Sequence, residues 1–128
     1  MIPTYISRQK SPELIQWIMA HMLRNHKGHS KAAKKDQIIR ELWGITPHSK
    51  EYSSKERLFR DCLEDGVQLH EALIISSESD GYWWADSLTD GLDFAEKKMA
   101  RARTILANAK KLIDNLKERY GGQIGMGL

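Results

Sequence analysis

A heptad seam near the C-terminus constrains the fold more than any other feature of this 128-residue sequence. Apolar and small residues recur there with alternating spacings of three and four, and no Gly or Pro interrupts them. Such a repeat is typical of a single long helix with an apolar stripe, and the stretch 90–120 would span about 45 Å as a helix. The seam residues are Leu92, Ala95, Met99, Ala102, Leu106, Ala109, Ile113, Leu116 and Tyr120.

The composition of this seam favours pairing between two copies of the chain. Large residues alternate with alanine, and alanine lets another helix approach closely. The flanking positions are mainly basic, so a parallel pair would place like charges together. We therefore expect residues 89–120 to form a homodimer with antiparallel or offset helices, with the seam from Leu92 to Leu116 as its contact. The alternative is a long helix that folds back on its own domain.

Two helices are expected in the first third of the chain, after an N-terminal arm over residues 1–10. Ser11 is a favourable N-cap, Pro suits the first helical position, and an apolar stripe at helical spacing extends over 12–25. A second apolar stripe predicts a helix over about 32–43, and Gly44 is expected to end it.

A third helix and a hairpin are expected next. Ser53 and Glu56 have the spacing of a capping box, which predicts a helix start at Ser53, and Gly66 is expected to end or break that helix. The β-rich run 73–77 is followed by the turn signal Asp-Gly and an aromatic run within 80–85. These signals predict a two-stranded antiparallel hairpin.

Three helices followed by a hairpin is the element order of a winged helix-turn-helix domain. The segment SSKERLFR (53–60), the run LIISS (73–77) and the segment GYW (81–83) resemble winged-helix modules that are common in phage and mobile-element proteins. The resemblance covers residues 12–86. It implies a mainly α, α+β fold in residues 1–88, with a two-stranded wing, and a helix over 53–65 that reads DNA. The implied function is non-enzymatic binding of double-stranded DNA, as in a phage or mobile-element regulator or replication accessory protein.

Two groups of side chains are candidates for DNA contact. Arginines on a recognition helix reach guanine edges, while Ser and Lys reach phosphate. Lysines around the junction of the first two helices are suited to a phosphate clamp at a helix N-terminus. Two other interpretations stay open: arginines paired with neighbouring acids, and an ordinary solvated lysine face. The candidates are Ser54, Lys55, Arg57, Arg60, Lys31, Lys34 and Lys35.

Charge is segregated along the chain. The net formal charge is +6 over residues 1–35, −3 over 36–72, −3 over 73–88 and +3 over 89–128. Basic ends suit nucleic acid, but they also suit packing on the acidic middle. The expected wing is acidic and would be repelled by phosphate. A second hypothesis therefore stays open, in which the winged helix is an adaptor or inhibitor that binds another protein and no DNA.

The sequence shows no pattern of an enzyme or a metal site. The five histidines lack the paired short spacings of zinc ligands, so we expect them on the surface, with no metal, cofactor or catalytic residue. The single Cys62 lies on an apolar helix face and suits a reducing cytosol. No apolar run reaches the ~20 residues of a membrane span, and the N-terminus lacks a secretory h-region, so we expect a cytoplasmic protein. Residues 121–128 are expected to form a flexible Gly-rich tail.

Overall fold

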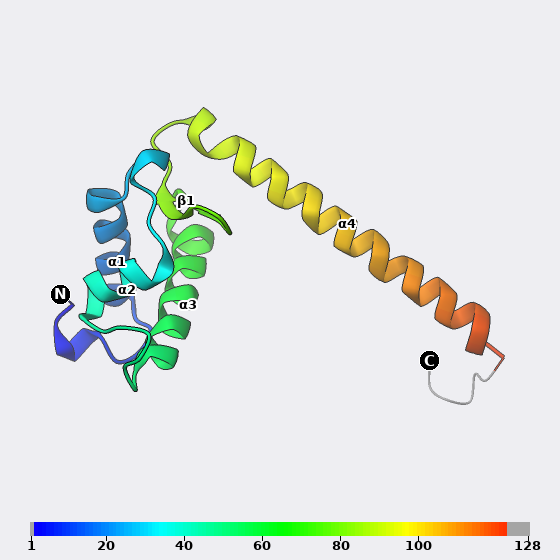
Figure 1. The fold of residues 1–128 in the computed structure, drawn as a ribbon, viewed down its shortest axis with the longest axis horizontal. Coiled ribbons are helices and arrows are strands. Elements are labelled where there is room, and N and C mark those ends of the chain that lie inside the picture. The colour runs from blue at the N-terminus through cyan, green and yellow to red at the C-terminus, as the bar shows by residue number, and fades with distance from the viewer. Residues whose placement is uncertain (1, 123–128) are drawn as a thin grey trace. The chain divides into compact units, whose positions relative to one another are not determined.

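The computed structural model describes residues 2–122 (Figure 1). The chain divides into two compact units, one that ends at Phe94 and one that begins at Ala95. The first contains three helices and one antiparallel hairpin, so the expected α+β, mainly helical architecture is confirmed. Its elements are α1 (Pro12–Asn25), α2 (Lys35–Trp43), α3 (Tyr52–His70), β1 (Ile74–Ser77) and β2 (Gly81–Trp84), with 3₁₀ turns at Thr4–Ile6 and His29–Lys31. The long helix α4 (Leu88–Tyr120) begins in the first unit and forms most of the second.

The helix α1 begins and ends where its sequence signals predict. The Ser11 hydroxyl accepts a hydrogen bond from the Leu14 N–H at 3.1 Å, as an N-cap should. The apolar stripe of the helix is buried, except that Leu23 is 43% exposed. In the arm before the helix, Ile2 is buried and donates its N–H to the Leu42 carbonyl at 3.0 Å, whereas Tyr5 is exposed.

The predicted start of α2 is three residues too early. Ala33 lies in extended backbone because its N–H and carbonyl both bond to Tyr82, and this pairing delays the helix until Lys35. The predicted end is confirmed, since Gly44 adopts the left-handed conformation of a helix C-terminus with φ 71°.

The predicted capping box at the start of α3 is wrong. The N-cap is Glu51, without a side-chain bond, and Ser53 lies inside the helix. The Glu56 carboxylate does not return to the helix start. It pairs instead with Lys35 of α2 at 3.2 Å and with Arg60 of the same helix at 2.7 Å. These two ion pairs replace the bond to the backbone that a capping box would form.

The prediction that Gly66 ends or breaks α3 is also wrong. The helix continues to His70, and Glu71 closes it in the left-handed conformation. Gly66 is buried against α1, where an added Cβ would lie 2.6 Å from the Met19 sulfur. The residue is small because α1 and α3 pack closely there.

The strand β2 makes backbone hydrogen bonds along both of its edges. Along one edge it pairs antiparallel with β1, as predicted. Along the other edge it bonds to the segment between α1 and α2: the Trp84 N–H donates to the His26 carbonyl at 2.7 Å, and Ala33 and Tyr82 exchange two bonds at 3.1 and 2.9 Å. Backbone hydrogen bonds on this second edge therefore fasten the hairpin to the α1–α2 connection.

The two faces of β2 have different neighbours. Tyr82 and Trp84 pack against the core formed by α1, α2 and α3. Trp83 points the other way, yet it is fully buried, because His29 stacks on it at 4.4 Å and Phe94 packs edge-on at 4.9 Å. The first turns of α4, up to Phe94, thus complete the first unit.

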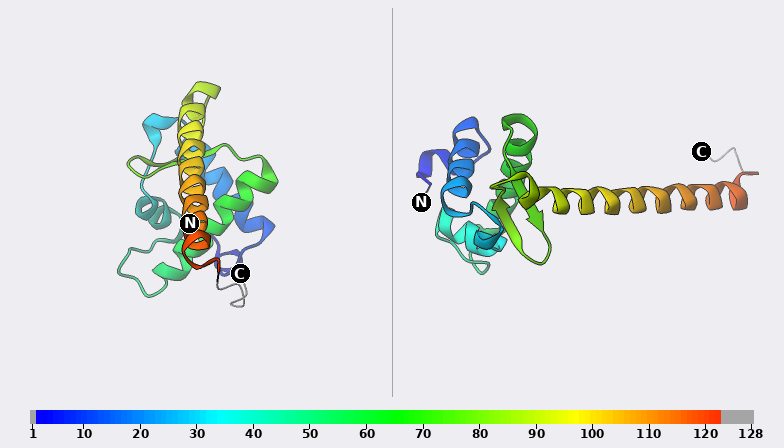
Figure 2. Two further views of the ribbon diagram at one scale, coloured as in Figure 1. Left: turned by 90° about the vertical axis from the view of Figure 1, so that its right-hand side faces the viewer. Right: turned by 90° about the horizontal axis from the view of Figure 1, so that it is seen from above.

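The predicted long helix is confirmed as one continuous element (Figures 1 and 2). Every residue from 95 to 120 is exposed in the single chain, including the seam side chains Met99, Leu106 and Ile113, which are 58%, 55% and 49% exposed. Of the predicted tail, only Gly121 and Gly122 lie within the described residues. No helix in residues 2–122 has both the length and the apolar character needed to cross a membrane.

Candidate nucleic-acid interface and a histidine–glutamate cluster

The N-terminal half of α3 carries the most open of the candidate DNA contacts. Arg57 is exposed, and within residues 2–122 it makes no hydrogen bond or ion pair. Ser54 is also exposed, and its hydroxyl donates to the Glu51 carbonyl at 2.9 Å. Arg60 is exposed but donates to Glu56, which is the pairing with a neighbouring acid that the sequence left open. Arg57 is therefore the candidate best able to reach an external ligand.

Lys55 acts inside the chain. Its ammonium donates to the Ser7 carbonyl at 2.6 Å and lies 5.9 Å from the centroid of the Trp43 ring. Burial lowers the pKa of this lysine, although the nearby Glu51 carboxylate opposes that shift. Lys55 thus holds the N-terminal segment against α3.

Two of the three candidate lysines near the start of α2 also have partners in the chain. Lys34 donates to the Ser79 carbonyl in the hairpin loop, and Lys35 pairs with Glu56 of α3. Lys31 is exposed. Lys34 and Lys35 therefore connect the hairpin loop and α3 to the start of α2. Of the three lysines, Lys31 is the one best placed to contact a ligand.

Two neighbouring side chains, His29 and Lys34, bond to the acidic hairpin loop. The Asp80 carboxylate lies 2.9 Å from His29 Nε2, and this hydrogen bond lowers the pKa of Asp80. Lys34 bonds to the same loop. The charge of Lys34 therefore offsets part of the repulsion between this loop and phosphate.

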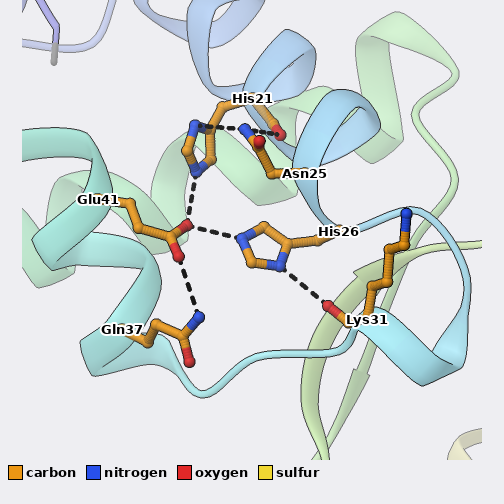
Figure 3. A network of polar contacts seen from close by, with 6 residues as sticks. All are labelled: His21, Asn25, His26, Lys31, Gln37 and Glu41. Carbon is orange, nitrogen blue, oxygen red and sulfur yellow. Dashed lines mark hydrogen bonds and ion pairs between the residues drawn. The ribbon is translucent and has the colours of Figure 1, made fainter.

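A cluster of two histidines and one glutamate joins α1 to α2 (Figure 3). Glu41 Oε1 lies 2.8 Å from His21 Nε2 and 2.7 Å from His26 Nε2. Its other oxygen accepts a hydrogen bond from the Gln37 side chain at 3.0 Å. Burial opposes ionisation of Glu41, but the hydrogen bonds from His26, Gln37 and His21 outweigh it and lower the pKa to about 2.

Both histidine rings are held at their second nitrogen as well. His26 Nδ1 lies 2.9 Å from the Lys31 carbonyl, and the Asn25 side-chain amide lies 3.2 Å from His21 Nδ1 (Figure 3). The expectation that all histidines lie on the surface is wrong for His26, which is 4% exposed. Sequence reasoning missed this cluster because Glu41 meets the histidines only through helix packing.

The cysteine has the buried position that the sequence predicts. Cys62 is fully buried on the core face of α3, and burial raises the pKa of its thiol to about 11. A thiol in this environment stays protonated near neutral pH and is a poor nucleophile.

The chain matches no protein-family model, no curated protein and no solved structure.

Proposed function

We propose that this chain is a non-enzymatic, winged-helix protein that binds double-stranded DNA, as a phage or mobile-element regulator or replication accessory would. In this proposal α3 is the recognition helix, α2 supports it, and β1–β2 is the wing. The order of elements supports the proposal. So does the fastening of β2 to the α1–α2 connection, because the hairpin and the helices then present one surface.

The observation that carries the proposal is the charge arrangement on the exposed face of α3. Ser54 and Arg57 are exposed in its N-terminal half, while the acids Asp61 and Glu64 are exposed nearer its C-terminal end. Helix-turn-helix proteins contact base edges with the N-terminal residues of the recognition helix. An open arginine at that end is the side-chain type that most often reads guanine.

Replacing Arg57 is expected to weaken binding to a preferred duplex. Losing one bidentate arginine–guanine contact costs about 1–3 kcal/mol, or roughly 5- to 150-fold in affinity. Arg57→Ala should show this loss in fluorescence anisotropy on a duplex selected from a random pool. Lys111→Ala removes the same charge from an exposed position of α4 outside the seam, and it should change affinity far less. Equal effects of the two variants would remove Arg57 from the interface.

We also propose that two copies pair through the α4 seam in antiparallel orientation. If the pair is centred between residues 107 and 108, Leu106 faces Ala109 of the other copy, Ile113 faces Ala102, and Tyr120 faces Ala95. Large residues then oppose alanine in these three pairings, while Met99 faces Leu116 in the fourth. A parallel pair would stack large on large and alanine on alanine, which leaves alternating wide and narrow layers.

The flanks of the seam support the same orientation. In the antiparallel register Ile105 lies near Leu112 of the other copy, which widens the apolar contact, and Glu96 lies near Lys117. The half-exposed seam is also a large apolar surface for a single chain. A dimer with two-fold symmetry would bind a palindromic DNA site.

The second candidate function is a winged-helix adaptor or inhibitor that binds a protein partner and no DNA. It is favoured by the cations that are already paired inside the chain, since Lys35 and Arg60 share Glu56 and Lys55 holds the N-terminal segment. This candidate predicts no DNA binding at low salt, which separates it from the first.

A further inference from the structure

We propose that His21, His26 and Glu41 form a binding site for a divalent transition-metal ion such as Zn²⁺. The ligand atoms would be the two Nε2 nitrogens and a Glu41 carboxylate oxygen, which lie within 4.8 Å of one another. Two imidazoles and one carboxylate form a ligand set that zinc accepts in tetrahedral sites. Metal–ligand bonds near 2.0–2.1 Å place neighbouring ligand atoms about 3.3 Å apart in a tetrahedron. The present N–O separations of 2.7 and 2.8 Å would need to widen only slightly.

The hydrogen bond at Nδ1 of His26 leaves its Nε2 directed at the Glu41 carboxylate. A carbonyl can only accept, so the Lys31 carbonyl fixes a proton on His26 Nδ1. In the neutral ring Nε2 then carries a lone pair, and it faces the Glu41 carboxylate at 2.7 Å, which is also an acceptor. A proton or a metal ion held between these two atoms would satisfy both of them. A metal ion there would bond to both atoms, and the His26 side chain that would hold it is only 5% exposed.

The surroundings of the three side chains suit a metal site. Metal-bound histidines are oriented by hydrogen bonds at their other nitrogen, and metal-bound carboxylates are hydrogen-bonded in turn. The Lys31 backbone carbonyl accepts such a bond from His26, and the Gln37 side-chain amide donates one to Glu41. At His21 the ring proton would move to Nδ1, and the neighbouring Asn25 amide would turn its oxygen toward it.

One side of the cluster is open to solvent. The side chains of His21 and Glu41 are 17% and 31% exposed, so the ion has an entry path and a water molecule can complete its coordination. A bound ion would connect α1, α2 and the segment that fastens the hairpin. Binding should therefore stabilise the folded chain by mass action.

The test is a calorimetric titration of the full chain with ZnCl₂ at pH 7.5, after treatment with a chelator. We expect one saturable site per chain and a rise in Tm that the chelator reverses. His21→Ala replaces a partly exposed ligand and should weaken Zn²⁺ binding at least about 10-fold, the lower end of the loss seen when even an outer-shell partner is removed. His48→Gln, which changes an exposed histidine outside the cluster, should leave binding unchanged.

A second readout uses the unmodified chain and so does not depend on a variant that folds. The imidazole proton resonances of His21 and His26 should shift on Zn²⁺ addition, while those of His48 and His70 should not. Absence of saturable binding, or full retention of it in His21→Ala, would overturn the proposal and leave His26 and Glu41 as a hydrogen-bonded pair only. The DNA-binding proposal does not depend on this result.

Discussion

Gly81→Ala is expected to lower the free energy of unfolding by about 3 kcal/mol or more. Gly81 has φ 93°, a conformation that L side chains rarely adopt, and an added Cβ would fall far inside contact distance of the Ala33 carbonyl oxygen. Relief of that clash requires the two backbone bonds between Ala33 and Tyr82 to open. The substitution therefore strains the hairpin and also releases it from the α1–α2 connection.

Urea unfolding followed by tryptophan fluorescence measures this loss. Gly122→Ala is the matched control, because nothing lies within 4 Å of its added Cβ, and it should change stability by less than about 0.5 kcal/mol. A loss below about 1 kcal/mol for Gly81→Ala would contradict the close approach of the hairpin to Ala33.

Ala102→Glu is expected to weaken self-association at least about 100-fold. In the antiparallel register Ala102 faces Ile113 of the other copy, so the new carboxylate would be buried without a partner. An uncompensated buried charge costs about 3–5 kcal/mol, which corresponds to more than two orders of magnitude in Kd. Sedimentation analysis over a range of concentrations measures the effect.

The control for this variant is Ala107→Glu, which makes the same change on the same helix but outside the seam. It should leave the dimer intact, since residue 107 remains exposed when the seam is paired. A monomeric unmodified chain, or equal association of the two variants, would exclude the seam as the interface.

Much of the fold could be predicted because its signals are local. The Ser11 cap, the Gly44 terminus and the long helix of the heptad repeat each depend on residues within one or two turns, and all three are confirmed. The errors at Ser53 and Gly66 have a shared cause. A capping-box spacing or a glycine looks the same in the sequence whether the residue ends a helix or makes a tertiary contact. Here Glu56 of the apparent capping box pairs with Lys35, and Gly66 packs against Met19.

The candidate sites were less predictable, because they depend on which elements meet. The sequence marks Lys55 as a surface cation, but only the fold brings the Ser7 carbonyl to it. Similarly, His21 and His26 are separated by the end of α1, and their convergence on Glu41 requires α2 to pack beside them. Arg57 stays open because its face of α3 points away from the core.

Salt-titrated binding of the unmodified chain to random and genomic duplex DNA tests the central claim most directly. A winged helix that contacts phosphates should bind at about 50 mM salt, and the logarithm of its binding constant should fall linearly with the logarithm of salt concentration. We also expect some genomic duplexes to bind more tightly than random ones. Absence of binding to any duplex at low salt would contradict the DNA-binding account and favour a protein partner.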